Sequence, residues 1–396
     1  MIEIVVIGTG MYSIGRGTDG FGTIVPAICE WAKNVKEEVR IHLVGSQSQN
    51  NDALQEKIQA FKKLSATKVD FELWPRQPEI NPTEYVRVLD GLSKPLCCIV
   101  AVPDDLHFAV AQNAIKRKIP TLVVKPLTPT CDEAETLIAM ADQYDTYGCV
   151  EFHKRFDAAN LMLRDYFQSG ELGGLLYSVV EYSQRIVIPT KIFRGWVERS
   201  NIFQYLGVHY VDIIKFITGA YPVRLSATGQ KTELFQQGID TPDSIQCSIE
   251  WAFPDSASKF VQTLHLNWID PETSPAMSNQ RIKLIGTKGR VESDQSYRGL
   301  SVYSAKTGFN TPNPYFCAQF GHEEGRVQWA GYGIDSITTF CDDCMDLSLG
   351  SVTKEALDRK RSSFRESFCS TAVVEACNTS LGEEGKWVPV KSERMI

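Results

Sequence analysis

The feature that most constrains the fold is a regular alternation of short apolar runs and helical patterns in the first part of the chain. Each apolar run is followed by an amphipathic stretch before the next run begins. This order predicts βαβ units, and nearly continuous apolar runs are typical of parallel strands that helices cover on both faces. The predicted strands cover residues 2–7, 39–44, 69–74, 97–102 and 121–125, and the predicted helices cover residues 23–35, 52–64, 83–92 and 106–118.

The texture of the sequence changes after residue 125. Two longer runs, residues 244–253 and 259–269, alternate apolar and polar side chains with a period of two. Such alternation indicates strands with one buried and one exposed face, as in an antiparallel or mixed sheet. We therefore expect an α/β protein with a Rossmann parallel sheet in residues 1–125. Residues 126–396 are expected to form an α+β domain with an open mixed, largely antiparallel sheet.

The composition argues against several classes of partner. The net charge is 41 − 48 = −7 without long blocks of like charge, whereas nucleic acids and anionic membranes require a concentrated basic surface. No run reaches the ~18 apolar residues of a membrane span, and the first ten residues lack the basic start of a signal peptide. The eleven cysteines are odd in number and lie mostly in apolar segments, which favours reduced thiols in the cytoplasm.

No metal site is predicted. Cys341 and Cys344 have CxxC spacing, but a four-ligand zinc site needs a second close pair, which the sequence lacks. These two cysteines are interpreted as ordinary helical thiols. His153, His265 and His322 also lack metal-ligand spacing.

A glycine-rich segment, GTGMYSIGRGTDGFGT, follows the first predicted strand and precedes a helix. Gly8 and Gly10 occupy the first two places of a GxGxxG pattern, whereas the third place is Ser13. An ordinary glycine-rich turn is the alternative, but its place between a strand and a helix favours binding of a dinucleotide pyrophosphate. The residues expected to contact the cofactor lie in this turn and after the second, fourth and fifth strands: Gly8, Gly10, Met11, Tyr12, Ser13, Ser46, Val102, Pro103, His107 and Lys125.

The segment after the second strand bears on the choice between NAD and NADP. An acid at this place bonds the ribose 2′-hydroxyl and repels a 2′-phosphate. Here the chain reads Gly45, Ser46, Gln47 and Ser48, with neither an acid nor a cation. Both cofactors stay open, with a slight preference for NADP because the serine hydroxyls can bond a phosphate.

Lys125 ends the fifth predicted strand and is followed by Pro126, which favours extended backbone at the lysine. Ligands of open α/β sheets bind beyond the carboxyl ends of the strands, so Lys125 is expected near the nicotinamide. The alternative is a lysine that merely marks where a strand meets solvent.

A second group of polar residues lies on a later helix, in QYLGVHYVDIIKF. Tyr205, His209 and Asp212 are spaced i, i+4 and i+7 and are expected on one face. Oxidation of an alcohol needs a base for the hydroxyl proton, which a histidine can supply while a lysine polarises the oxygen. Buried hydrogen bonds are the alternative for His209, and orientation of a neighbouring group is the alternative for Asp212. Further substrate contacts are expected from residues that are equally compatible with a solvated surface: Arg155, Arg185, Arg194 and Trp196.

Four segments, in order, resemble the Gfo/Idh/MocA family, the relatives of glucose–fructose oxidoreductase and inositol dehydrogenase. They are VAVPDDLHFAVAQNAIKRKIPTLVVKPLTPTCDEAETLIAMA, HKRFDAANLMLRDYFQSGELGGLLY, LGVHYVDIIKFITG and IKLIGTKGRVESD, and the resemblance covers about residues 2–295. It implies a Rossmann domain followed by an α/β domain whose open mixed sheet often packs against another subunit. It also implies hydride transfer between NAD(P) and a hydroxyl-bearing carbon, with the family lysine on Lys125 and the family histidine on His209.

The sequence departs from the family pattern at two positions. The glutamate of the family's Glu-Lys-Pro motif is Val124 here, and the aspartate four residues before the histidine is Tyr205. Glucose–fructose oxidoreductase-like relatives use a tyrosine in this region, so a phenol is expected to share the proton transfer. Loss of the acid and a drier setting both disfavour the protonated amine, which raises the question whether Lys125 titrates nearer neutrality.

These features predict a cytoplasmic NAD(P)-dependent dehydrogenase or reductase that acts on the CH–OH group of a sugar, cyclitol or sugar acid. A homo-oligomer, either a dimer or a tetramer, is expected. Two alternatives stay open: a non-catalytic NAD(P) sensor, and a sugar–sugar oxidoreductase that keeps its cofactor bound.

Overall fold

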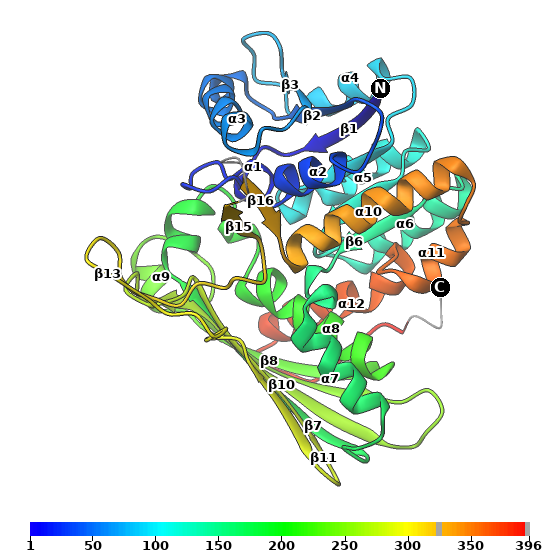
Figure 1. The fold of residues 1–396 in the computed structure, drawn as a ribbon. Coiled ribbons are helices and arrows are strands. Elements are labelled where there is room, and N and C mark those ends of the chain that lie inside the picture. Colours follow the sequence, from blue (N-terminus) through cyan, green and yellow to red (C-terminus); the bar gives the residue numbers. More distant parts are fainter. Residues whose placement is uncertain (322–326, 393–396) are drawn as a thin grey trace. The chain divides into compact units, whose positions relative to one another are not determined.

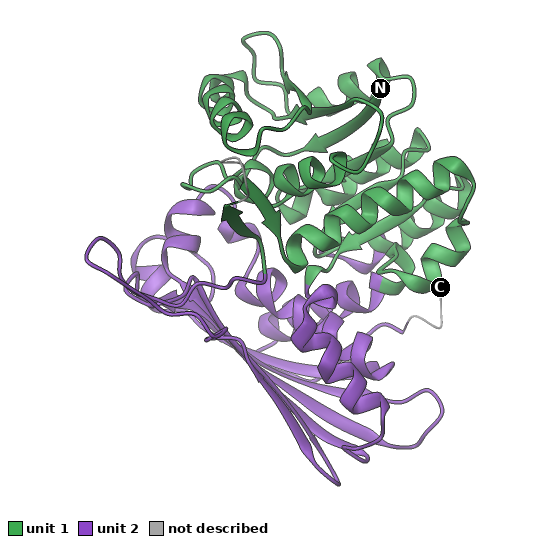
Figure 2. Ribbon diagram, viewed as in Figure 1, with its two compact units in different colours: residues 1–127, 133–153, 316–366 green, residues 128–132, 154–315, 367–396 purple. Residues whose placement is uncertain are grey.

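The computed structural model describes residues 1–321 and 327–392, so the interpretation of His322 lies outside the described residues. The chain divides into two compact units, which Figure 2 distinguishes by colour. Unit 1 comprises residues 1–127, 133–153 and 316–366, and unit 2 comprises residues 128–132, 154–315 and 367–396.

Unit 1 is built on a six-stranded sheet in the order β3-β2-β1-β4-β5-β6 (Figure 1). All neighbouring strands in this sheet pair in parallel, which confirms the predicted Rossmann sheet. The strands are β1 (Ile2–Ile7), β2 (Val39–Val44), β3 (Asp70–Trp74), β4 (Cys97–Val100), β5 (Thr121–Val124) and β6 (Gly148–Glu151).

Helices connect these strands where the periodicity predicts them. In α3, for example, Leu54, Ile58 and Phe61 are buried at the spacing of one helical face. These side chains join a core that also contains strand residues such as Ile4 and Ile41. The helices that lie wholly or mainly in unit 1 are α1 (Met11–Ile14), α2 (Ile24–Ala32), α3 (Asn51–Ser65), α4 (Glu84–Gly91), α5 (His107–Lys116), α6 (Cys131–Gln143), α10 (Tyr332–Leu349) and α11 (Lys354–Lys360), and a small hairpin is formed by β15 (Ala318–Gly321) and β16 (Val327–Ala330).

Unit 1 includes two segments that a single division at residue 125 assigns to the second domain. β6 extends the parallel sheet at its edge, and all four of its residues are buried. α10 packs against α2, where Trp31 donates a hydrogen bond from Nε1 to Asp342 over 2.8 Å. The chain therefore first passes from unit 1 to unit 2 close to residue 125. β6 and α10, which come later in the chain, also belong to unit 1.

Unit 2 contains a seven-stranded sheet in the order β12-β11-β7-β10-β9-β8-β17. β7 and β10 are parallel and the other neighbours are antiparallel, which confirms the predicted open mixed sheet. The predicted alternation holds in β9, where Ile245, Cys247, Ile249 and Trp251 are buried. The strands are β7 (Leu175–Arg185), β8 (Tyr221–Gln230), β9 (Ser244–Ala252), β10 (Lys259–Asp270), β11 (Ser278–Gly286), β12 (Arg290–Asp294) and β17 (Val388–Pro389), and a separate hairpin is formed by β13 (Val302–Ser304) and β14 (Gly308–Asn310).

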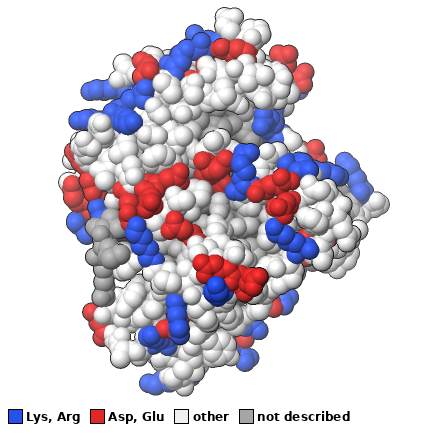
Figure 3. Space-filling view, turned by 180° about the vertical axis from the view of Figure 1, so that it is seen from behind, with Lys and Arg blue, Asp and Glu red and all other residues white. Residues whose placement is uncertain are grey.

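Helices cover one face of this sheet (Figure 1). On that face Gln262 of β10 donates a hydrogen bond from Nε2 to the carbonyl of Tyr210 over 3.0 Å, which joins the sheet to α8. The helices that lie wholly or mainly in unit 2 are α7 (Ala158–Gln168), α8 (Val208–Thr218), α9 (Glu233–Gln236) and α12 (Phe364–Gly382). Within the described ranges, no helix combines the length and the apolar character needed to cross a membrane. On the face drawn in Figure 3, basic and acidic side chains are interspersed rather than gathered into one basic surface.

Candidate active site

The glycine turn of unit 1 follows β1 directly. Gly8 has a φ of +108°, and a Cβ atom there would lie 2.1 Å from the carbonyl oxygen of Ala101, so the residue must be glycine for this approach to β4. A Cβ atom on Gly10 would meet nothing within 4 Å. The turn therefore combines a close contact between strands with open space at Gly10, which is the geometry that approach of a pyrophosphate needs.

The helix after the turn is interrupted. α1 ends at Ile14 and is followed by Gly15, whose φ is +71°, and α2 begins at Ile24. The intervening loop returns to the first turn of helix, because Thr23 donates its backbone N–H to the carbonyl of Tyr12 over 2.7 Å. Ser13, which occupies the place of the third glycine of GxGxxG, lies in the short helix and is buried. The predicted contacts of Met11, Tyr12 and Ser13 with a cofactor thus come from one turn of helix.

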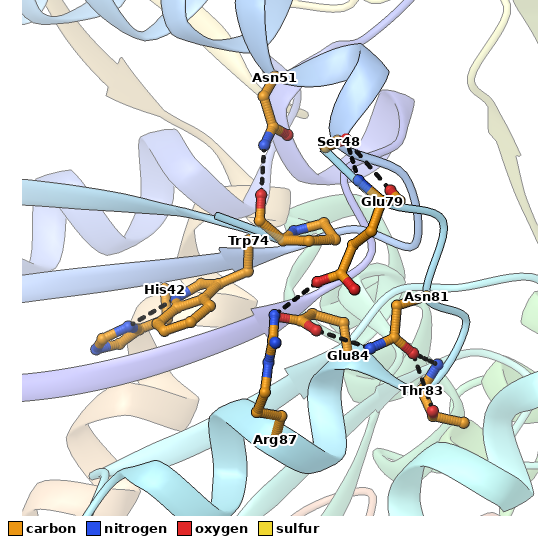
Figure 4. Close-up of polar contacts among 10 residues, drawn as sticks. His42, Ser48, Asn51, Trp74, Glu79, Asn81, Thr83, Glu84 and Arg87 are labelled. Atoms are coloured by element: carbon orange, nitrogen blue, oxygen red, sulfur yellow. Dashed lines mark hydrogen bonds and ion pairs between the residues drawn. The ribbon is translucent and has the colours of Figure 1, made fainter. Parts of the chain in front are cut away.

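The loop after β2 contains the two serines that bear on cofactor choice. Ser48 donates from its hydroxyl to the carbonyl of Glu79 over 3.2 Å and accepts the backbone N–H of the same residue over 2.9 Å (Figure 4). Gln47 forms a β-bridge with Ile80 on the same loop. Ser46, which follows the end of β2, is exposed.

His107 joins the ends of β4 and β5. Its Nδ1 lies 2.8 Å from the carbonyl oxygen of Pro126, and its Nε2 lies 3.0 Å from that of Val102. The side chain is buried, and this burial lowers the pKa of His107 in spite of the nearby charge of Asp104. His107 therefore positions the two strand ends, and the predicted cofactor contacts of Val102, Pro103 and His107 stay predictions.

Lys125 follows β5 at the carboxyl edge of the sheet, and the peptide bond to Pro126 is cis. Burial lowers the pKa of Lys125 to about 8, although the charges of Asp104 and Glu151 act in the opposite direction. A lysine near this pKa is distributed between its ammonium and amine forms at neutral to mildly basic pH. Burial is therefore the main cause of the lowered pKa of Lys125.

A buried cluster that sequence reasoning missed lies at the end of β6. The carboxylate of Glu151 accepts a hydrogen bond from Ser336 of α10 over 2.6 Å and lies 3.0 Å from Nδ1 of His153. The hydroxyl of Tyr12 lies 3.4 Å from the same ring nitrogen. Glutamate in the middle of the apolar run GCVEF was the available signal, because a buried acid must be hydrogen bonded or paired.

The other predicted site residues belong to unit 2. The predicted helix is present, but Phe203–Gly207 forms a π-helical turn before α8, so the spacing from Tyr205 to His209 does not follow α-helical geometry. A Cβ atom on Gly207 would lie 2.8 Å from Leu266 and 2.9 Å from the Phe203 ring, so close packing against β10 accompanies the wider turn. π-helical turns occur frequently at functional sites.

Tyr205 lies in this π-helical turn and His209 lies in α8, where its side chain is buried. Burial raises the pKa of Tyr205 to about 12, against the opposite effect of a hydrogen bond with Gln184. The phenol therefore stays protonated at neutral pH. The ring of Phe193 lies 4.8 Å from that of Tyr205 and 4.4 Å from that of Trp196, so the predicted tryptophan belongs to an aromatic group around the phenol.

The predicted arginines differ in their surroundings. Arg155 donates from Nε and Nη2 to the two carboxylate oxygens of Asp212, over 2.8 Å and 2.6 Å. Arg185 donates to the carbonyl of Ser274, and Arg194 is exposed and pairs with Glu198 over 3.2 Å. The expected substrate contacts of these residues stay predictions.

Family models match both units. Residues 20–152 match an oxidoreductase family with an NAD-binding Rossmann fold, and residues 161–292 match the GFO/IDH/MocA C-terminal domain. The first match begins after the Gly8–Gly10 turn, so the predicted cofactor contacts of that turn stay predictions.

Curated relatives and solved structures agree with these models. The rhizopine catabolism protein MocA of Rhizobium meliloti is 27% identical over 148 residues, which cover 37% of this chain and 46% of the relative. Inositol 2-dehydrogenase of Corynebacterium glutamicum (strain R) is 28% identical over 179 residues, which cover 42% of this chain and 49% of the relative. The chain thus spans about half the length of these curated relatives. The crystal structure of scyllo-inositol dehydrogenase from Lactobacillus casei, with bound NAD(H) and scyllo-inositol, has the same fold, with a TM-score of 0.67 and 11% identity over 99% of this chain and 100% of that chain.

Proposed function

Because the chain belongs to the Gfo/Idh/MocA family of oxidoreductases, we propose that it transfers hydride between NAD(P) and a hydroxyl-bearing carbon of a small, sugar-like molecule. The observation that carries this proposal is Lys125, a lysine with a pKa of about 8 at the carboxyl edge of a Rossmann sheet. A perturbed lysine at this edge is suited to hold and polarise a reacting oxygen.

The glycine turn supports binding of a dinucleotide. Gly8 permits the close approach to β4, and the space at Gly10 leaves room for phosphate oxygens beside backbone N–H groups. When bound, the nicotinamide supplies the hydride acceptor or donor. The family model and a structural neighbour support NAD as a cofactor, and NADP stays open because the exposed Ser46 stands where an acid would repel its phosphate.

The proton chemistry is assigned to residues of unit 2. We assign His209 as the base that takes the hydroxyl proton, with the phenol of Tyr205 sharing the transfer, while the Lys125 ammonium polarises the oxygen. Substrate contacts are assigned to Arg155, Arg185, Arg194, Trp196 and Asp212. Support for these roles comes from the match between the chain and the family pattern at Lys125 and His209.

A cyclitol, sugar or sugar acid is the proposed substrate class. Relatives named inositol 2-dehydrogenase and a neighbour crystallised with scyllo-inositol support a polyhydroxylated ring. The predicted arginines support a sugar acid as the alternative, because a guanidinium binds a carboxylate through two parallel hydrogen bonds.

The deciding experiment is a titration followed by a turnover screen. Binding of NADH and NADPH is measured by fluorescence, and inositols, aldoses and sugar acids are then tested for reduction of NAD and NADP. Lys125→Met is expected to lower kcat by about 100-fold, whereas Lys116→Met, at an exposed position of α5, keeps full activity. Tight cofactor binding without turnover on any substrate favours the sensor, and a cofactor that survives gel filtration without turnover of added NAD(P) favours the sugar–sugar oxidoreductase.

A homo-oligomer and a cytoplasmic location complete the proposal. On the outer face of the unit 2 sheet, Tyr177 and Val261 are paired neighbours of β7 and β10 and are 46% and 38% exposed. A second copy that covers this face would remove both side chains from water. Light scattering of the wild type and of Val261→Glu tests the association.

The proposed cytoplasmic location rests on the cysteines, because the burial of ten of the eleven thiols fits a reducing compartment.

A further inference from the structure

Glu151 is a buried acid that none of the roles above uses. It is the last residue of β6, its exposed fraction is 3%, and in the sheet register it stands opposite Val124 of β5. Lys125 is the next residue along the chain after Val124. The parallel pairing of β5 and β6 therefore brings a carboxylate to the strand end that carries the lysine.

Glu151 is held in its ionised form. Burial acts to raise the pKa of its carboxyl, but the charge of His153 and hydrogen bonds from His153, Ser336 and Tyr12 outweigh burial and lower the pKa. Burial, and after it the charge of Glu151, raises the pKa of the Tyr12 phenol well above its usual value. The phenol and the serine hydroxyl are therefore available as donors to a carboxylate that stays negative at neutral pH.

Charged or titratable groups among the described residues of unit 1 interact electrostatically with Lys125. Asp104, in the turn after β4, and Glu151 both stabilise the ammonium form, while His107 of α5 interacts electrostatically with the lysine. The glutamate that precedes the lysine in the family pattern is Val124 in this chain. β5 thus lacks the acid of the family pattern, whereas the carboxylate of Glu151 on β6 lies beside the same strand end.

We propose that Glu151 takes the place of the missing acid at residue 124 and acts as a positioning residue that keeps Lys125 in its ammonium form. This proposal rests on the proposed function, in which the ammonium polarises the reacting oxygen. The competing explanation is that Glu151 only anchors α10 to the sheet through Ser336. The two explanations differ in their effect on the charge of Lys125, because an anchor changes stability without changing the titration of the lysine.

The test measures the titration of Lys125 directly in the full-length protein without substrate. Lysines are labelled by reductive ¹³C-methylation and followed by NMR from pH 5 to pH 11, and the Lys125 signal is the one missing from Lys125→Arg. In Glu151→Gln, which keeps the size and hydrogen bonding of the side chain, the pKa of Lys125 is expected to fall from about 8 by roughly one pH unit. In Ser336→Ala, which removes the anchor and keeps the charge, the pKa is expected to stay near its original value while thermal stability falls.

A rescue variant tests whether an acid at residue 124 can replace Glu151. Adding Val124→Glu to Glu151→Gln is expected to bring the pKa of Lys125 back to the wild-type value, and Glu151→Ala, which also removes the charge, serves in place of Glu151→Gln if the latter does not fold. An unchanged Lys125 titration in a folded Glu151 variant overturns the proposal, and failure of Val124→Glu to restore the pKa overturns this replacement. Since no turnover is measured, these results stand even if Lys125→Met leaves turnover intact and the proposed function falls.

Discussion

The guanidinium of Arg155 donates two hydrogen bonds to the carboxylate of Asp212, and the side chains of this pair are only 10% and 1% exposed. The pair joins the segment after β6 to α8 within unit 2. A buried ion pair with two parallel hydrogen bonds is costly to break by removal of one partner, because the other charge stays buried. Asp212 therefore has a role in stability whether or not it also contacts substrate.

We expect Asp212→Ala to lower the free energy of unfolding by about 3 kcal/mol, measured by urea denaturation followed by tryptophan fluorescence. Asp240→Ala is the matched control, because Asp240 forms an exposed pair with Lys231 over 2.7 Å in the same unit and its loss should cost less than ~1 kcal/mol. Equal stability of the two variants would contradict the structural role. A raised KM without loss of stability would assign Asp212 to substrate binding alone.

Substitution by alanine is expected to affect stability at Gly8 and cofactor binding at Gly10. Gly8→Ala places a Cβ atom 2.1 Å from a backbone oxygen at a φ of +108°, so we expect a loss of about 3 kcal/mol in stability. Gly10→Ala meets no neighbour within 4 Å and should leave the melting temperature nearly unchanged, yet weaken NADH binding about tenfold or more because it fills the phosphate space. Differential scanning fluorimetry and fluorescence titration separate the effects, and NADH affinity unaltered by Gly10→Ala would remove the turn from the cofactor site.

Ser46 is expected to control the choice between NAD and NADP. Ser46→Asp should favour NADH over NADPH by about tenfold, since an acid bonds the ribose hydroxyls and repels a 2′-phosphate. Ser46→Arg should shift the ratio in the opposite direction by a similar factor. Ser48→Ala is the control, because its hydroxyl is engaged by the backbone of Glu79 and the variant should leave the ratio of dissociation constants unchanged. A ratio that responds to Ser48 and not to Ser46 would show that the ribose lies elsewhere.

Activity is expected to depend on a group with a pKa of about 8. If the Lys125 ammonium polarises the reacting oxygen, kcat/KM falls as the pH rises through this value, because the amine is the form above it. Lys125→Arg keeps a positive charge at all accessible pH values, so its smaller residual activity should lose this descending limb. A wild-type profile that rises through pH 8 would instead assign the lysine as a base.

The same pKa has a consequence for stability. The unfolded lysine has a pKa near 10.5 and the folded one a pKa of about 8, so between these values the unfolded chain binds more protons. The contribution of Lys125 to the free energy of unfolding therefore rises with pH over this window and is constant below it. Comparison of wild type with Lys125→Met by urea denaturation at pH 7 and pH 10 checks the sign. The free energy of unfolding of the wild type minus that of Lys125→Met should be more positive at pH 10 than at pH 7, and a lower value at pH 10 would contradict the prediction.

Much of the fold follows from local patterns in the sequence. The apolar runs of the first 125 residues coincide with five of the six parallel strands, to within two residues at each end. Period-two alternation in β9 and β10 identified their buried faces, because side-chain direction in a strand depends on sequence parity alone. Gly8 and Lys125 were recognisable as candidates because each stands directly at the end of an apolar strand, where parallel sheets bind ligands.

The remaining features depend on contacts between distant segments. The sequence did not indicate that residues 148–151 continue the parallel sheet, that a π-helical turn contains Tyr205, or that Arg155 pairs with Asp212. Periodicity describes how one element presents its faces, whereas pairing, register and ion pairs are chosen by packing among elements far apart in the chain. The sequence by itself therefore determined that Lys125 ends a strand of a Rossmann sheet and that its neighbour is valine. Only the tertiary structure decided that Glu151 lies opposite that valine, because the register of β5 and β6 is a property of the folded sheet.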